Sequence, residues 1–266
     1  MIDLHAHILP GVDDGVKDDA EAVEAARQAS AFGVDSIVAT PHVIPGVFVN
    51  NRSGILEAVA RLQGVLDNQE VAVRVFPGAE YYVEPDLPKK LAQGELLTVN
   101  DRGQHVLVEL PMQNVPAYVD QVLFDLLVRG VTPVLAHPER NRELVDDPGK
   151  LYRLVQKGIL VQVTAGSLLG MFGREARTAA EFFVRQRWVH FLASDLHGAG
   201  ERLLALKEAV EKLAGYVGNE GARMLVEENP RCVLVGERVD IGELLPFERR
   251  RGGLFSTLMG RIKSGR

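Results

Sequence analysis

Histidine and carboxylate residues recur where predicted strands end, and these residue types bind divalent metals. The N-terminal stretch MIDLHAHILPGVDDG carries His5 and His7 two residues apart on a predicted strand. Side chains at this spacing point to the same face of a strand, about 7 Å apart at the backbone. A Pro-Gly pair ends the strand, and Asp13 and Asp14 follow in a turn. This stretch would supply half of a metal site, so further ligands must come from elsewhere in the chain.

Six of the seven predicted strands finish in a His, Glu or Asp residue. The strand ends read DLHAH, VATPH, FPGAE, VLVEL, VLAHP, VQVTA and LASDLH. The candidate ligands that they contribute are His5, His7, His42, Glu80, Glu109, His137, Asp195 and His197. In parallel α/β barrels the carboxyl ends of the strands meet at one mouth, where the chemistry takes place. The other two histidines, His105 and His190, fall outside this pattern and are predicted to be ordinary strand residues.

The ligand types indicate which metals such a site would bind. Imidazole and carboxylate groups without a thiolate suit Zn, Mn or Fe better than calcium or a soft metal. One ion takes about four to six ligands including water, so this set is large enough for two ions, or three if a carboxylate bridges. Closely spaced divalent ions usually serve hydrolysis, especially of phosphate esters.

Apolar strands that alternate with amphipathic helices must position these residues. The predicted strands are residues 2–7, 36–42, 72–80, 105–110, 132–137, 160–165 and 190–195. The predicted helices are residues 19–32, 53–68, 116–128, 148–157, 174–187 and 201–213. Gly33, Gly130 and Gly158 stand where helices should end, because glycine adopts the left-handed turn at low cost. The alternation favours a closed parallel α/β arrangement. Residues 219–235 either add a last helix and strand or form neither.

Composition is that of a folded globular protein. The chain has 266 residues, of which 46% are hydrophobic and 25% charged, enough for one barrel or two smaller domains. We expect a cytoplasmic location, because there is no membrane-spanning run or signal-peptide pattern and the single cysteine, Cys232, excludes an internal disulfide. The net charge of −6 argues against nucleic acid as the partner.

The C-terminal segment 248–266 has a charge pattern of its own. It holds six cationic residues and one acidic residue. Leu254, Phe255, Leu258, Met259 and Ile262 repeat there at helical spacing. A basic amphipathic helix of this kind would contact an anionic membrane or a partner, and a solvated terminus or a packing contact is the alternative.

A second motif, CVLVGER, has the spacing of a thiol-based tyrosine phosphatase, with Cys232 and Arg238 separated by five residues. That chemistry needs a lowered thiol pKa and a loop of free backbone N–H groups around the phosphate. The apolar residues 233–235 instead indicate a buried strand, and Glu237 would place an anion where the phosphate must bind. We therefore predict that Cys232 is not the nucleophile.

Six motifs in register carry a family resemblance over about residues 1–236: DLHAHILPGVDDG, ATPH, GAEYY, VELP, HPERN and SDLHG. The chain resembles the polymerase-and-histidinol-phosphatase (PHP) superfamily and, within it, the bacterial CpsB/YwqE-type protein-tyrosine phosphatases of capsular and exopolysaccharide clusters. The resemblance implies a distorted (β/α)7 TIM-like barrel, the PHP fold, over residues 1–247. It also implies a trinuclear metal centre, with Mn preferred over Fe or Zn.

The resemblance implies a role for individual residues as well. It places His5, His7, Glu80 and Asp195 around one ion, Asp14, His42 and His197 around a second, and His137, Glu109 and bridging Glu80 around a third. Many superfamily members have a histidine in place of Asp14, and Asp13 is the alternative ligand. Arg140 and Arg202 match arginines that bind phosphate, a task that suits the planar guanidinium. On sequence alone, Arg202 fits a surface helix position equally well.

The activity implied is hydrolysis of phosphotyrosine by a metal-bound hydroxide that attacks phosphorus in line with the leaving phenolate. A phenol has a pKa of about 10 and leaves far more easily than an alkoxide. An open mouth at residues 43–48 and 81–83 would admit a phosphotyrosine on a flexible tail, such as that of a bacterial tyrosine kinase. The alternatives are a small-molecule phosphatase, such as a histidinol-phosphate phosphatase, and a metal-stabilised regulator that docks on a kinase without turnover.

Overall fold

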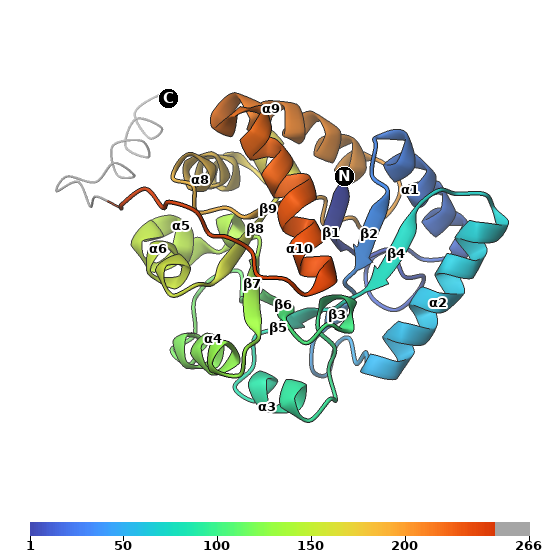
Figure 1. The fold of residues 1–266 in the computed structure, drawn as a ribbon, viewed down its shortest axis with the longest axis horizontal. Coiled ribbons are helices and arrows are strands. Elements are labelled where there is room, and N and C mark those ends of the chain that lie inside the picture. The colour runs from blue at the N-terminus through green and yellow to red at the C-terminus, as the bar shows by residue number, and fades with distance from the viewer. Residues whose placement is uncertain (248–266) are drawn as a thin grey trace, which may run out of the picture.

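Parallel strands form the centre of residues 1–247, the part of the chain that the computed structural model describes (Figure 1). One sheet has the order β1-β2-β4, and a second has the order β3-β5-β6-β7-β8-β9. The strands are β1 Ile2–Ala6, β2 Ser36–Ala39, β3 His42–Val43, β4 Arg74–Pro77, β5 Glu80–Tyr82, β6 His105–Glu109, β7 Thr132–Ala136, β8 Leu160–Thr164 and β9 Phe191–Ala193. The predicted α/β fold with parallel strands is confirmed. The predicted tail, residues 248–266, lies outside the described residues, so its membrane contact stays a prediction.

Helices surround these strands and follow most of them in the chain (Figure 1). They are α1 Asp19–Ala31, α2 Arg52–Asn68, α3 Leu87–Ala92, α4 Val119–Val128, α5 Arg142–Asp146, α6 Pro148–Gln156, α7 Ala165–Leu169, α8 Arg174–Arg185, α9 Glu201–Arg223 and α10 Asn229–Val235. All six predicted helices are present. The short helices α3, α5 and α7 were not predicted, because five or six residues are too few to show a helical period. No helix within residues 1–247 combines the length and the apolar character needed to cross a membrane.

Two of the seven predicted strands are each broken into two, and the breaks separate the sheets. Residues 36–42 divide at Pro41 into β2 and β3, and residues 72–80 divide at Gly78 into β4 and β5. Pro41 has no N–H to donate to a ladder. A side chain at position 78 would place its Cβ 2.8 Å from a methyl of Val38, so only glycine fits this close approach. The strand ends that carry the predicted ligands are thereby transferred from one sheet to the other.

The ends of β1 and β9 bring the two sheets together on their other side. The amide of His7 donates to the carbonyl of Leu196 at 2.8 Å, and the amide of Asp195 donates to the carbonyl of His5 at 2.9 Å. The pairing of β1 with β2 shifts register between Asp3 and Ala6, an irregularity of the kind that redirects side chains. The first and last predicted ligands along the chain are therefore neighbours.

The prediction of a buried strand at residues 233–235 is wrong, because this segment is the end of α10. Val233 and Leu234 pack with Leu4, Leu107 and Phe191 in a core between the sheets. Figure 1 shows α10 crossing over the strands near the N-terminus of the chain. Three apolar residues in a row are too few to show a period, so they fit a buried strand and a buried helix equally well.

His105 and His190 lie away from the predicted ligands, as the sequence pattern indicates. His105 begins β6, and its Nδ1 has no hydrogen-bond partner among the described residues. His190 directly precedes β9, and its Nδ1 accepts a hydrogen bond from the amide of Val161 at 3.0 Å. Both are almost fully buried, and this burial lowers the pKa of each imidazole to about 4.

We predict that His105→Leu reduces the loss of stability at acid pH. The unfolded chain protonates this imidazole near its ordinary pKa of about 6.5, whereas the native state resists protonation down to about 4. Stability is therefore lost as pH falls through this window, at up to about 1.4 kcal/mol per pH unit for one group. Urea denaturation at pH 7.5 and pH 5 measures the difference. An equal loss in the variant and the wild type would exclude His105 as its source.

Candidate metal centre

Strand pairing assembles three of the predicted ligands. His42 of β3 pairs with Glu80 of β5, and Tyr82 of β5 pairs with Glu109 of β6. Neighbouring strands lie about 5 Å apart, so side chains on the same face of this short ladder converge. The distance from His42 Nδ1 to Glu80 Oε2 is 3.1 Å. The register of three strands therefore decides this part of the site.

Two further ligands lie directly after strands in strained backbone. His137 follows β7 with φ of 30°, and Asp195 follows β9 with φ of 53°. Residues other than glycine rarely adopt this left-handed region, and such residues cluster at functional sites. His137 Nε2 lies 3.0 Å from Glu80 Oε1, and Asp195 Oδ1 lies 3.5 Å from His5 Nε2. The strained turns aim both side chains at the same centre.

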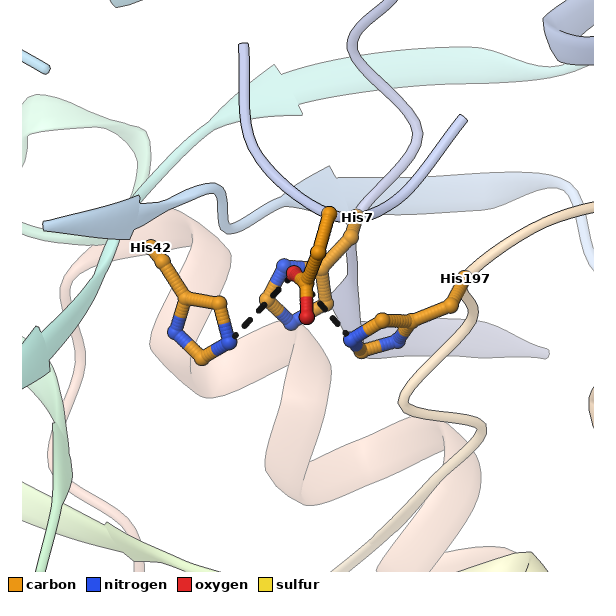
Figure 2. A group of neighbouring side chains, drawn as sticks. His7, His42 and His197 are labelled. Carbon is orange, nitrogen blue, oxygen red and sulfur yellow. Dashed lines mark ion pairs between the residues drawn. The ribbon is translucent and has the colours of Figure 1, made fainter. Parts of the chain in front are cut away.

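Seven of the nine predicted metal ligands fall into three overlapping groups, and the other two, His137 and Asp195, adjoin these groups at Glu80 and His5. Figure 2 shows the rings of His7, His42 and His197 turned toward one another, with dashed lines for ion pairs. Three groups have ligand atoms within 4.8 Å of one another: His7, Asp14, His42 and His197; His5, His7 and Glu80; and His42, Glu80 and Glu109. Because His7, His42 and Glu80 each belong to two groups, the cluster is continuous.

Glu80 is the residue on which the cluster converges. Its Oε2 lies 3.2 Å from His5 Nε2, 3.3 Å from His7 Nε2 and 3.1 Å from His42 Nδ1. Neither this oxygen nor His42 Nδ1 makes a hydrogen bond of acceptable geometry, although both atoms are buried. Burial would raise the pKa of the Glu80 carboxyl, but the surrounding imidazoles hold it well below its usual range. A buried carboxylate amid nitrogen atoms with lone pairs suits a bridging ligand of two cations.

The tautomers of His5 and His7 also suit metal binding. His5 Nδ1 lies 2.9 Å from Gln162 Oε1, and His7 Nδ1 lies 2.7 Å from Asp13 Oδ2. Both partners are acceptors, so each Nδ1 carries a proton and each Nε2 is the nitrogen left to bind a metal, once any proton on it is displaced. The two Nε2 atoms are 3.1 Å apart. Two lone pairs at this distance repel each other unless a cation or a proton lies between them.

Asp13 and Asp14 have different roles in this geometry. The Asp13 carboxylate accepts hydrogen bonds from the amides of Gly15 and His42 and from the His7 ring. Asp14 Oδ1 instead faces ring nitrogens, 3.7 Å from His42 Nε2 and 3.6 Å from His197 Nε2. Asp14 therefore has the position of a ligand, and Asp13 orients two histidines that belong to the cluster.

Three other titratable groups, Glu109, Asp195 and His7, show how strongly the site is polarised. Burial and the Glu80 charge raise the pKa of Glu109 to about 7. Burial also raises the pKa of Asp195, but the charges of His5 and His137 outweigh this and bring it to about 2. Burial lowers the pKa of His7, but the carboxylates of Asp13 and Glu80 beside its two ring nitrogens raise it to about 10, so without a metal its Nε2 keeps a proton. A metal must displace protons from such groups, so its affinity will depend on pH.

Asp195 also connects the cluster to the two predicted phosphate-binding arginines. Its Oδ1 faces the histidines, while its Oδ2 lies 2.7 Å from Arg140 Nη1 and 3.1 Å from Arg202 Nη1. Arg202 also lies 2.6 Å from His197 Nδ1. Arg202 thus lies on a helix, as the alternative predicts, but its guanidinium contacts the cluster and not solvent alone. Both guanidinium groups border the cluster of candidate ligands and remain partly exposed.

Sequence reasoning missed two residues of this site. Gln162 is a polar residue in the otherwise apolar strand LVQVT, which was a usable signal. Phe172 lies against both arginines, and nothing in its local pattern indicates this. Cys232 is in α10, and burial and nearby Glu237 and Glu228 raise the pKa of its thiol. This is the opposite of an activated cysteine nucleophile.

Residues 1–235 match the family described as "Capsular polysaccharide synthesis, CpsB/CapC". The chain belongs to this family. It is 38% identical to tyrosine-protein phosphatase YwqE of Bacillus subtilis (strain 168), covering 94% of this chain and 98% of that relative. It is 29% identical to tyrosine-protein phosphatase CpsB of Streptococcus pneumoniae, covering 90% of this chain and 100% of that relative. The predicted resemblance is thus confirmed.

A solved structure of the CpsB/CapC family matches with a TM-score of 0.89 at 38% identity, covering 94% of this chain and 100% of the other. It comes from work on YwqE from Bacillus subtilis and CpsB from Streptococcus pneumoniae, described as unique metal-dependent tyrosine phosphatases. The histidinol phosphate phosphatase of Lactococcus lactis subsp. lactis Il1403 has a TM-score of 0.52 at 14% identity. At that identity the likeness is one of fold alone.

We predict that Asp13→Asn weakens the binding of Mn²⁺ about 10- to 100-fold, the usual cost of losing a residue that orients a ligand. In the wild type, one Asp13 oxygen accepts from the amide of Gly15, and the other accepts from the His7 ring and the amide of His42. An asparagine has only one acceptor oxygen, so it cannot keep all three hydrogen bonds. Calorimetric titration of metal-stripped protein measures the affinity without any assay of turnover. Asp67→Asn, on the exposed side of α2, is the matched control. An unchanged affinity in the Asp13 variant would contradict the orienting role.

Proposed function

We propose that this CpsB/CapC-family protein is a metal-dependent protein-tyrosine phosphatase. The observation that carries the proposal is the placement of Asp195, with one oxygen toward the imidazole cluster and the other toward Arg140 and Arg202. A phosphate monoester needs both a cationic centre and bidentate donors for its oxygens, and here they are adjacent. The activity of the relatives YwqE and CpsB supports the same conclusion.

We infer that the ligands divide as the family resemblance implies. One set is His5, His7, Glu80 and Asp195, a second is Asp14, His42 and His197, and a third is His137, Glu109 and bridging Glu80. These nitrogen and oxygen donors fit two to three Mn²⁺ ions, and Fe or Zn has the same ligand preferences. We also infer that the strands form the distorted (β/α)7 barrel of the PHP fold over residues 1–247, since the end of β1 pairs at Ala6 with Leu196, in the segment that follows β9.

Divalent ions bound to this cluster supply an activated water and neutralise charge on the phosphoryl group. The chain itself supplies the remaining parts. Arg140 and Arg202 donate N–H groups to the phosphoryl oxygens, after exchanging part of their contact with Asp195 for the substrate. A leaving phenolate needs little help from a general acid, because its conjugate acid has a pKa of about 10.

A groove beside the cluster supports a peptide as the substrate in preference to a small molecule. It has a volume of about 620 Å³ and includes Val43, Phe48, Val49, Tyr82, Leu87 and Leu96 in its lining. Phe48 stacks on His42, with ring centroids 5.8 Å apart and planes at 10°, so the groove adjoins the site. Its cation Lys90 is already paired with Glu84 and Asp86 at 3.1 and 3.0 Å. The groove therefore suits apolar residues next to a phosphotyrosine, as on the tail of a tyrosine kinase of polysaccharide synthesis.

We predict that chelation abolishes phosphate release from a phosphotyrosine peptide, whereas Cys232→Ser retains it within about twofold. The thiol belongs to α10, and its raised pKa disfavours the thiolate. Phosphate release after EDTA treatment, and after Mn²⁺ is added back, measures the effect. The opposite pair of results would overturn the metal-dependent assignment. A tenfold preference for histidinol phosphate over the peptide would instead overturn the substrate.

We predict that Val49→Gln lowers kcat/KM about fivefold for a phosphotyrosine peptide with apolar neighbours and leaves p-nitrophenyl phosphate unchanged. Val49 is 82% exposed on the rim of the groove, so the substitution removes apolar contact without disturbing the core. Steady-state kinetics with both substrates separate the two effects. Val128→Gln, on an exposed face of α4, is the matched control. Equal changes for both substrates would argue against a peptide in the groove.

A further inference from the structure

Phe172 contacts both arginines of the proposed phosphate site. Its ring centroid lies 4.4 Å from the Arg140 guanidinium carbon and 5.3 Å from that of Arg202. Both distances are within the range of cation–π attraction, about 6 Å. Phe172 stands in the connection between α7 and α8, whereas Arg140 follows β7 and Arg202 begins α9. One ring therefore joins three separate segments of the chain beside the cluster.

The backbone around Phe172 is shaped to bring the ring close. Gly170 and Gly173 flank it with φ of 90° and 92°, a region that favours glycine. A Cβ at Gly166 in α7 would lie 2.9 Å from Phe172 Cε2 and 3.0 Å from Met171 Sδ. Gly166 thus leaves the space into which Phe172 and Met171 pack.

The two guanidinium groups need such a partner, because they carry like charges and share one carboxylate oxygen. Asp195 Oδ2 is the acceptor for Arg140 and the nearest carboxylate oxygen for Arg202. Two cations held against one oxygen repel each other. The negative π face of an aromatic ring attracts both, and it stays in place if the carboxylate turns toward a metal or a substrate displaces it.

An alternative position is open to Arg140 if the ring is absent. A cavity of about 340 Å³ lies beside the site, and its lining includes Arg140, Phe172, Asp146 and Glu175. Asp146 is already paired with Arg142 at 3.5 Å, so Glu175 is the carboxylate that would attract a guanidinium that moved into this cavity, away from Asp195. Phe172 lines the same cavity and so restrains Arg140 on the side that faces the cluster.

We infer that Phe172 is a positioning residue that holds Arg140 and Arg202 together for the phosphoryl group. This inference rests on the proposed phosphatase function, since it assigns the arginines to phosphate. Phe172 does not touch the reacting atoms. It acts through the two guanidinium groups, and its effect is on phosphate affinity and not on metal content.

The test compares Phe172→Leu with Phe172→Tyr in the manganese-loaded full-length chain. We expect Phe172→Leu to raise the competitive inhibition constant of inorganic phosphate about tenfold and to raise KM for a phosphotyrosine peptide similarly. Phe172→Tyr keeps the ring and should remain within twofold of the wild type. The Mn²⁺ content should be unchanged in both variants, which a general loss of structure would not allow.

Gly166→Ala tests the same inference without altering the ring itself. Its new methyl group would displace Phe172 from the arginines, so we expect weaker phosphate binding. Gly64→Ala is the matched control, because Gly64 is on the exposed face of α2 and an added Cβ would meet no atom within 4 Å. Arg140→Ala separates the two levels of the proposal. If Arg140→Ala weakens phosphate binding and Phe172→Leu does not, the role of Phe172 is contradicted but the phosphatase proposal is not. If Arg140→Ala has no effect on phosphate binding, both the role of Phe172 and the assignment of the arginines to phosphate are contradicted.

Discussion

The burial of Glu80 among imidazoles is the constraint on which the rest of this structure depends. A fully buried carboxylate loses several kcal/mol of solvation unless positive charge and hydrogen bonds compensate for it. Three ring nitrogens lie within 3.3 Å of one oxygen, from His5 in β1, His7 just after it and His42 in β3, and they compensate for its charge only when protons or cations occupy them. The fold must therefore hold these strand ends in register, because a displaced strand would leave the carboxylate unpaired.

Several local features follow from this requirement. The interruptions at Pro41 and Gly78 move the ends of two strands into the second sheet, where His42 and Glu80 become paired neighbours. The left-handed backbone at His137 and Asp195 turns the ends of β7 and β9 inward. Such conformations cost about 1–3 kcal/mol each, so the surrounding packing must maintain them. The burial of a large hydrophobic core offsets this conformational strain.

Asp195 relates the two halves of the site. One oxygen belongs to the imidazole cluster and the other to the arginines, so occupancy on one side changes the electrostatic environment of the other. This coupling explains why the arginines need support from outside the cluster. Phe172 supplies it from the α7–α8 connection, and the groove past Phe48 extends the site in another direction. Connections that follow the strands thus supply Phe172 and the lining of the groove, while the strand ends supply most of the candidate ligands.

The sequence by itself determined the candidate ligands, because parallel strands place their carboxyl ends together whatever the intervening helices are. The period of the apolar residues was enough to locate those strands and six of the helices. Only the tertiary structure distinguished the role of Asp13 from that of Asp14, because two adjacent acidic residues in a turn differ only in the groups that surround their carboxylates. It also showed that residues 233–235 are helical, and that Gln162 and Phe172 belong to the site. The partner of Gln162 lies 157 residues away in the chain, and those of Phe172 lie about 30 residues away. Local pattern carries no information on contacts over such separations.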